Sequence, residues 1–128
     1  MHSRSHLMGS HPLTADAVSA HVPEQTPGAY VLGFKTHDVF TVQRVGRADE
    51  NLRAHLAALA EEGRYRSFKF LPTATTGEAF DTECFLYHEF GADRHLDNES
   101  HPPRPAGARW ICPHCSVFGI RDWRASAR

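Results

Sequence analysis

Two neighbouring stretches in the first half of the chain have the hydrophobic pattern of β-strands. Residues 28–35 combine aliphatic and aromatic side chains, and residues 39–45 have a similar composition. Only the short polar segment 36–38 separates them. Two strand-like stretches joined by so short a connection are typical of a β-hairpin, so we expect the two strands to pair antiparallel.

A helix is predicted directly after the hairpin. Apolar residues recur there at spacings of three and four, which places them on one face of a helix; they are Leu52, Leu56, Leu59 and Ala60. Asp49 or Asn51 would cap the start of this helix. Gly63 would end it.

Aromatic and polar residues then largely alternate from Tyr65 to Leu71, which predicts a third strand with one face in water. Thr75 or Thr76 is expected to cap a second helix over residues 78–90. Three strands and two helices in this order predict a mixed fold of the α/β (α+β) class.

The 128 residues of the chain are enough for one compact domain. Residues 1–27 contain prolines and histidines with little periodicity, so we expect a flexible tail and discount His11 and His21 as site residues. Residues 28–102 would form the core. Residues 103–128 would form a C-terminal segment that ends in a basic tail.

Charge and cysteine content exclude some classes of protein. The net charge of −1 argues against binding to nucleic acid through bulk positive charge, although it leaves room for a local basic groove. The apolar runs are too short to span a membrane, and residues 1–11 lack the apolar core of a signal peptide. Three cysteines, two of them in a Cys-x-x-Cys turn, favour metal-bound thiolates in a reducing compartment, so a cytoplasmic protein is expected.

Five short motifs follow one another in a distinctive order. They are Gly28-Ala29-Tyr30, Arg44-Val45-Gly46, the helix start at 51–56, the helix start at 78–83 and Leu96-Asp97-Asn98. In this order and spacing they resemble the GIY-YIG nuclease superfamily, over roughly residues 28–102. The resemblance is to a small single-domain member with a C-terminal Cys-x-x-Cys zinc knuckle. It implies a small α/β (α+β) domain built on a three-stranded antiparallel sheet flanked by helices.

The resemblance implies hydrolysis of DNA phosphodiester bonds with one divalent cation, Mg²⁺ or Mn²⁺. Such chemistry needs a carboxylate for the metal, a base for the attacking water and a cation for the developing charge. By position, Glu83 would hold the metal and Tyr30 would help to activate water. Arg47 matches a basic residue after the second motif, and Asn98 matches a polar residue after the glutamate helix. Taken singly, Glu83 would also suit an ordinary solvated helix position.

Two positions depart from the family pattern. The tyrosine of the second motif is replaced by Arg44, and the usual helix arginine is replaced by His55. Arg53 lies two residues earlier, about 200° around the helix, so it cannot simply substitute. If the chain entered the helix at a different angle, Arg53 would reach the site. A protonated His55 would supply part of the positive charge of an arginine. Both are therefore candidate catalytic residues.

Four residues have the types and spacing of a structural zinc site. Cys84 and His88 lie at i and i+4 on the predicted second helix, and Cys112 and Cys115 form the Cys-x-x-Cys turn. His101 is one of the further candidate ligands. Such a closed Zn²⁺ site would fix the helix that presents Glu83. The alternative is three buried, reduced cysteines without a metal.

Three functions follow from these patterns. The first is a metal-dependent DNA endonuclease, with RNA as an alternative substrate. The second is a nucleic-acid-binding module on the same fold with weakened chemistry, which the residues at positions 44 and 55 favour. The third is a zinc-knuckle interaction protein, which the near-zero net charge favours. Recognition of a long DNA site by so small a domain would need a homodimer or a partner protein.

Overall fold

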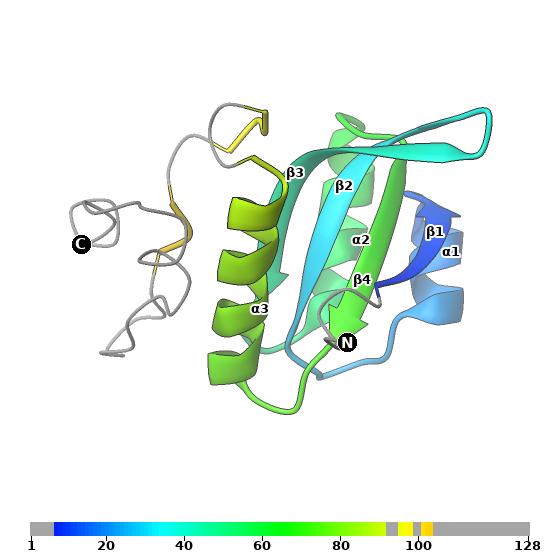
Figure 1. The fold of residues 1–128 in the computed structure, drawn as a ribbon. Coiled ribbons are helices and arrows are strands. Elements are labelled where there is room, and N and C mark those ends of the chain that lie inside the picture. The colour runs from blue at the N-terminus through cyan, green and yellow to red at the C-terminus, as the bar shows by residue number, and fades with distance from the viewer. Residues whose placement is uncertain (1–6, 92–94, 99–100, 104–128) are drawn as a thin grey trace.

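The computed structural model describes residues 7–91, 95–98 and 101–103. Within these residues the chain has an α+β fold built on one four-stranded sheet (Figure 1). The elements, in chain order, are β1 (Met8–Pro12), α1 (Ala15–His21), β2 (Gly28–Thr36), β3 (Val39–Ala48), α2 (Leu52–Glu62), β4 (Ser67–Pro72) and α3 (Thr76–Glu89).

The predicted hairpin is confirmed as β2 and β3, which pair antiparallel along their whole length. Its two-residue turn, His37-Asp38, has positive φ angles of 51° and 70°. Two positive φ angles are typical of the type I′ turn, whose twist matches that of paired strands. The register places Tyr30 opposite Gly46 and shifts by one residue beyond Leu32, so β3 carries a bulge at Gln43.

Both predicted helices form, with caps that the sequence indicated. The Asn51 side chain accepts a hydrogen bond from the backbone N–H of Ala54 at the start of α2. Gly63 ends that helix in the left-handed conformation. The Thr75 side chain accepts from the N–H of Glu78 at the start of α3. These bonds satisfy N–H groups that have no partner inside the helix.

The sheet has one strand more than expected, and the expected flexible tail is wrong for residues 8–22. In this segment β1 pairs antiparallel with β4, and α1 follows it. Leu13, Val18 and Val22 are buried in the same cluster as Leu56 of α2. The sheet order is therefore β1-β4-β2-β3, with β1 and β3 at its edges.

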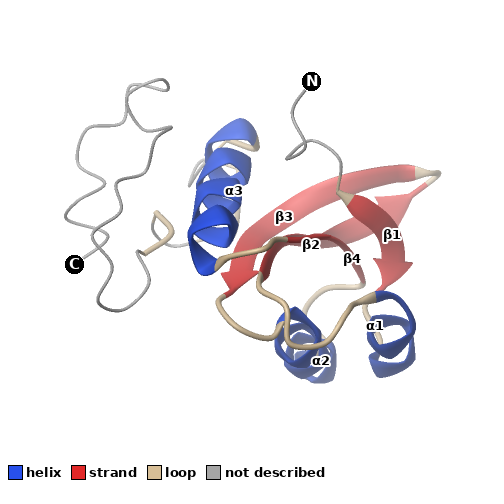
Figure 2. Cartoon of the chain, turned by 90° about the horizontal axis from the view of Figure 1, so that it is seen from below, coloured by secondary structure: helices blue, strands red, loops and turns tan. Residues whose placement is uncertain are grey.

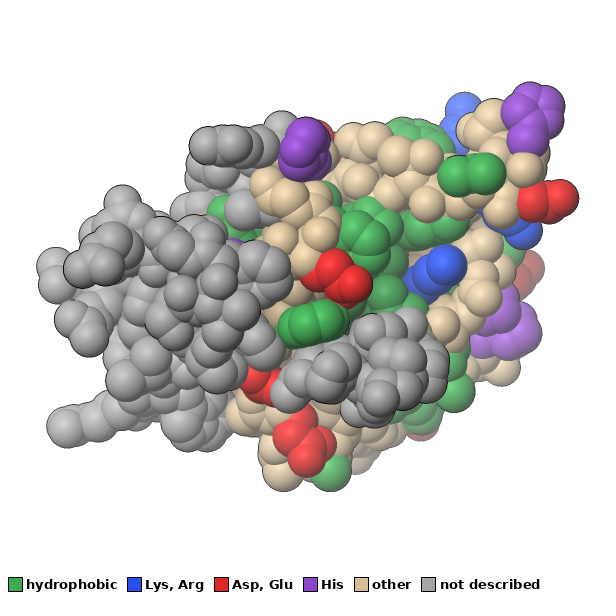
Figure 3. Space-filling view, in the orientation of Figure 1, with side chains coloured by type: hydrophobic (Ala, Val, Ile, Leu, Met, Phe, Trp, Pro, Cys, Tyr) green, Lys and Arg blue, Asp and Glu red, His purple; other side chains and the backbone are tan. Residues whose placement is uncertain are grey.

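The helices lie on both faces of the sheet (Figure 2). α1 and α2 cover one face, where the larger core cluster contains Tyr30 and Phe68. α3 packs on the opposite face over β2 and β3, where a second cluster contains Val31, Val45 and Leu86. Beside α3, hydrophobic and polar side chains mix on the exposed sheet face (Figure 3). β3 is thus an edge strand, with α2 on one face of the sheet and α3 on the other.

Candidate active site

A pocket of about 390 Å³ opens at the outer edge of β3. Its polar lining comes from five different parts of the chain: Tyr30, Arg44, Arg64, Glu83, Asp97 and Asn98. Val45, Gly46, Pro102 and Pro103 complete it. Tyr30 and Glu83, the two residues to which the sequence assigned the central chemistry, thus line one pocket.

Tyr30 reaches this pocket because Gly46 has no side chain. The two residues are paired across β2 and β3, so their side chains would point to the same face of the sheet. A Cβ atom at position 46 would overlap the Oη and Cζ atoms of Tyr30. The tyrosine ring therefore occupies the space above the edge strand. Tyr30 from the α2 face and Glu83 from the α3 face thereby line the same pocket.

His55 on α2 is the hydrogen-bond partner of Tyr30. Its Nε2 atom lies 2.9 Å from the Tyr30 Oη atom. Partial desolvation of the ring lowers the pKa of His55, against the opposing charges of Asp49 and Glu62. Burial, followed by the charge of Glu83, raises the pKa of Tyr30. The pair is therefore a neutral imidazole and a protonated phenol near pH 7.

Glu83 lies on α3 in a buried ion pair with Arg47 of β3. The Arg47 Nη1 atom donates to Glu83 Oε1 at 2.7 Å and to the carbonyl of Pro103 at 2.6 Å, while Nε donates to Asp49 at 2.6 Å. The guanidinium also lies over the Phe80 ring, 5.3 Å from its centroid. Burial raises the pKa of Glu83 to about 7, although Arg47 opposes the rise. Arg47 thus holds the carboxylate of Glu83 in place.

Asn98 lies beside the site, bound to the edge of β3. Its Oδ1 atom accepts from the N–H of Val45 at 3.0 Å, and its Nδ2 atom donates to the Val45 carbonyl at 2.7 Å. The neighbouring Asp97 donates its N–H to the Gln43 carbonyl and accepts from the Tyr65 hydroxyl at 2.7 Å. Residues 97–98 therefore cover part of the open edge of β3, and the Asn98 amide is engaged in that role.

Arg53 lies away from the pocket. Its Nε atom donates to the Val22 carbonyl at 2.7 Å, and its Nη1 atom forms an ion pair with Glu24 at 3.0 Å. The structure therefore does not bring Arg53 to Tyr30 or Glu83, and its role here is to tie α2 to the segment after α1. The pocket contains Arg44 and Arg64 instead, which the sequence analysis did not select as site residues.

Comparisons with protein-family models, with curated proteins and with solved structures found no match. The chemistry of the pocket is therefore argued from its own residues. Mg²⁺ and Mn²⁺ prefer oxygen ligands, and Mg²⁺ is commonly held by one or two carboxylates together with waters and phosphate oxygens. Glu83 supplies one carboxylate to a pocket with room for such waters. The donor set fits a divalent cation held in part by the substrate.

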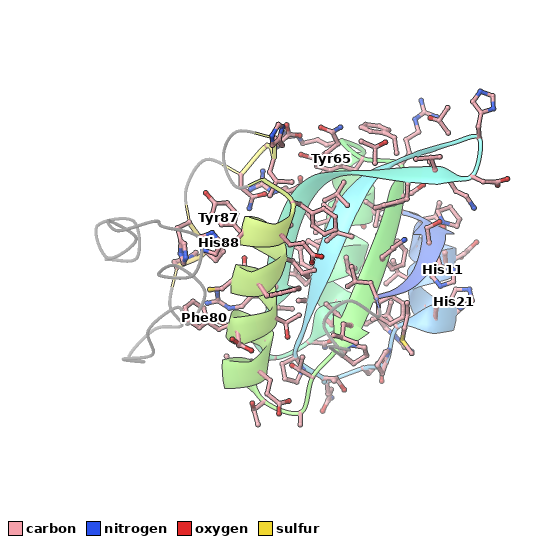
Figure 4. The ribbon with its side chains drawn as sticks, viewed as in Figure 1. His11, His21, Tyr65, Phe80, Tyr87 and His88 are labelled. Carbon is pink, nitrogen blue, oxygen red and sulfur yellow. The ribbon has the colours of Figure 1, made fainter. Side chains whose placement is uncertain are left out.

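Two of the four predicted zinc ligands lie in the described part of the chain. Cys84 and His88 are both buried on α3, one turn apart. The ring of His101 approaches that of His88, with centroids 5.3 Å apart, and also packs against Tyr87. In Figure 4, Tyr87 and His88 lie at one side of the molecule, and His11 and His21 lie at the opposite side. Cys112 and Cys115 lie outside the described residues.

The described ranges contain no group of three or more His, Cys, Asp or Glu residues arranged to hold a metal ion. They also contain no helix that is long and apolar enough to cross a membrane.

Proposed function

We propose that this chain is a metal-dependent endonuclease that hydrolyses phosphodiester bonds of DNA. One observation carries the proposal: the Tyr30 hydroxyl and the Glu83 carboxylate come from opposite faces of the sheet and line the same pocket. A hydroxyl with a basic partner and a carboxylate for a cation are the groups that such hydrolysis needs.

Tyr30 and His55 would move the proton of the attacking water. With its own proton on Nδ1, His55 accepts the Tyr30 O–H at Nε2. As water attacks the phosphorus, its proton passes to Tyr30 Oη while the tyrosine proton passes to His55. The bond from phosphorus to the leaving oxygen breaks, and that oxygen takes a proton from solvent. His55 lies on the exposed side of α2 and returns its proton to water.

Glu83 would hold the Mg²⁺ or Mn²⁺ ion. The ion supplies charge neutralisation at the phosphate oxygens, which lowers the barrier to attack. Arg47 keeps one oxygen of Glu83 in a fixed position, so the carboxylate faces the pocket in one orientation. Rigid support of this kind is what a weakly held cation requires.

The order of the helices and strands supports the proposed likeness to GIY-YIG nucleases. The motif-bearing segments are consecutive elements here, with Tyr30 on β2, Gly46 on β3 and Glu83 on α3. The proposal places the protein in the cytoplasm, where thiols stay reduced and DNA is accessible. On a long DNA site it would act as a homodimer or with a partner protein.

A specific observation favours a second candidate, a DNA-binding module with weakened chemistry. Glu83 Oε1 is already bonded to Arg47, and a metal ion would compete with that ion pair. In this alternative the pocket binds phosphate without hydrolysing it. Salt-dependent DNA binding without cleavage would identify it.

The decisive experiment is plasmid nicking by purified protein in Mg²⁺ or Mn²⁺, with Glu83→Gln tested beside the wild type. We expect the variant to lose cleavage by at least about 100-fold, because a metal ion supplies several kcal/mol and each 1.36 kcal/mol changes the rate tenfold. Glu89→Gln is the matched control, since Glu89 is exposed on the same helix. It should cleave like the wild type.

Cleavage that Glu83→Gln retains would refute the assigned role of Glu83. Folded wild-type protein that binds DNA but never nicks it would replace the nuclease by the binding module. Folded protein that neither binds nor nicks DNA would leave the third function, a zinc-knuckle interaction protein.

We also propose a structural Zn²⁺ ion held by Cys84, His88, Cys112 and Cys115. Support comes from the one-turn spacing of Cys84 and His88 on α3 and from their burial. Thiolate and imidazole ligands suit tetrahedral zinc. Since Cys84 follows Glu83 directly, the ion would stabilise the turn of α3 that carries the candidate metal ligand.

Metal analysis of protein prepared without chelators tests the zinc proposal. We expect about one zinc per chain, bound by thiolates that are deprotonated only with the metal present. Cys112→Ser should lose the zinc and lower the melting temperature by about 5 °C or more, because metal binding contributes to folding. His114→Ala, inside the same turn, should keep the metal. Zinc far below one equivalent in folded wild-type protein would contradict the proposal.

A further inference from the structure

Two arginines that the sequence analysis did not assign to the site line the pocket together. Arg44 lies on β3 and is half-buried, and Arg64 follows Gly63 at the end of α2 and is exposed. They come from segments 20 residues apart in the chain. The fold therefore places two guanidinium groups on the same pocket as Tyr30 and Glu83.

The register of the hairpin explains the position of Arg44. Arg44 pairs with Leu32 and lies two residues before Gly46, so it projects to the same face of the sheet as Tyr30. The bulge at Gln43 immediately precedes it, and bulges re-aim the side chains beside them. The positive charge of Arg44 acts on the hydroxyls of both Tyr30 and Tyr65.

Tyr65 lies beside both arginines. The Arg64 guanidinium lies over its ring, 5.7 Å from the centroid, and the positive charge of Arg44 acts on its hydroxyl. The same hydroxyl donates to Asp97, which fixes the tyrosine. The cation–π contact limits how freely the Arg64 guanidinium can move.

Among the residues that the structure describes, no carboxylate forms an ion pair with Arg44 or Arg64. Arg47 and Arg53, in contrast, form ion pairs with carboxylates. The carboxylates that share the pocket have other partners, since Glu83 is bonded to Arg47 and Asp97 to Tyr65. Arginine is well suited to planar contacts with phosphate oxygens, so the available charge points to an anionic ligand.

We propose that Arg44 and Arg64 bind the phosphate group of DNA that is cleaved, and that Arg44 supplies the positive charge at the transition state. The inference rests on the proposed function for its substrate. The inference also gives a role to Arg44, which replaces the tyrosine of the second family motif and had no assigned role. A neutral His55 can then act on Tyr30, because the charge comes from β3 and not from α2.

The test compares Arg44→Gln and Arg64→Gln with Arg66→Gln, a nearby exposed arginine outside the pocket. Binding of a labelled DNA duplex is measured at several salt concentrations without added Mg²⁺ or Mn²⁺ and without a chelator, so that the DNA is not cleaved and the proposed Zn²⁺ stays bound. Each phosphate contact contributes about 0.9 to the slope of log K against log salt concentration. We expect each pocket variant to lose about that much slope and Arg66→Gln to lose none. Circular dichroism establishes that every variant is folded.

Single-turnover cleavage in Mg²⁺ separates the two arginines. Arg44→Gln should slow cleavage by at least about 100-fold, as loss of one preorganised donor to transition-state charge does. Arg64→Gln should affect binding more than rate. Arg44→Lys keeps the charge but not the planar fork, so it should retain the salt slope and recover only part of the rate.

The binding measurement and the cleavage measurement together distinguish failure of the phosphate site from failure of the proposed nuclease function. A wild-type protein that never cleaves, but whose salt slope falls in both pocket variants, would overturn hydrolysis and support the phosphate site. A wild type that cleaves, with pocket variants that keep its slope and rate, would support hydrolysis and overturn the phosphate site. Wild-type protein that does not bind the duplex would also overturn it.

Discussion

Replacement of Arg47 by methionine is expected to lower the free energy of unfolding by about 3–5 kcal/mol, because it leaves a buried carboxylate without its counter-charge. The side chains of Arg47 and Glu83 are only 9% and 7% exposed. Methionine is unbranched and flexible, so it fills most of the space of the arginine stem without restoring the charge. Denaturant unfolding without added Mg²⁺ or Mn²⁺ measures the change.

A double-mutant cycle shows whether the loss comes from the ion pair. Arg47→Met combined with Glu83→Gln removes both charges, so the double variant should recover a large part of the stability that Arg47→Met loses. Asp49→Asn is the control, because Asp49 is bonded to the same guanidinium but is 43% exposed. It should cost less than about 1 kcal/mol. Equal stability of Arg47→Met and the wild type would mean that Glu83 does not depend on Arg47.

The ion pair links stability to the proposed chemistry. Glu83 must stay in one orientation to present an oxygen to the pocket, and its position on a buried helix face does not by itself ensure this. Arg47 provides the constraint through bonds to Glu83, to Asp49 and to the Pro103 carbonyl. In the proposed site Arg47 is therefore a positioning residue, a role that its place after the second motif did not indicate.

The elements that the sequence predicted are those with long hydrophobic patterns and clear ends. The hairpin has two strands of 9 and 10 residues around a two-residue turn. α2 is bounded by Asn51 and Gly63, whose capping roles depend on local backbone geometry alone. Such signals lie within one stretch of chain, so they can be recognised without knowledge of the tertiary packing.

Site geometry was less predictable, because side-chain direction depends on register and packing. The sequence did not indicate that Gly46 leaves room for the ring of Tyr30, which lines one pocket with Glu83. Arg53 was kept as a candidate, and the rotation of α2 turns it towards Val22. Arg44 was seen only as a departure from the family pattern. Its place in the pocket follows from the hairpin pairing and the bulge at Gln43.

The N-terminal segment was missed because its elements are short, although a local signal was present. β1 has 5 residues and α1 has 7, too few for a clear period. Thr14 caps α1 by accepting from the N–H of Ala17. Leu13 just before the cap and Val18 in the first turns are both buried in one cluster, the arrangement called a hydrophobic staple. The sequence feature that indicates this staple is the pair Leu13-Thr14 followed by Val18, four residues after the threonine.

A chain that begins at Pro23 is therefore expected to lose cooperative folding. Leu13, Val18 and Val22 are buried, and burial of such side chains contributes about 1.5–3 kcal/mol each. Their summed contribution is similar to the total stability of many domains, about 5–15 kcal/mol. The deletion also exposes β4, which pairs with β1, and removes the Val22 carbonyl that Arg53 binds. Near-ultraviolet circular dichroism and thermal unfolding measure the loss.

Two point variants test the same expectation without shortening the chain. Val18→Asp places a charge in the core between α1 and α2, where Val18 is 1% exposed, so it should strongly destabilise the fold. Ser19→Asp puts the same side chain on the next, exposed position of α1 and should change the stability by no more than about 0.5 kcal/mol. If both variants and the shortened chain melted like the wild type, residues 8–22 would be the dispensable tail that the sequence pattern suggested.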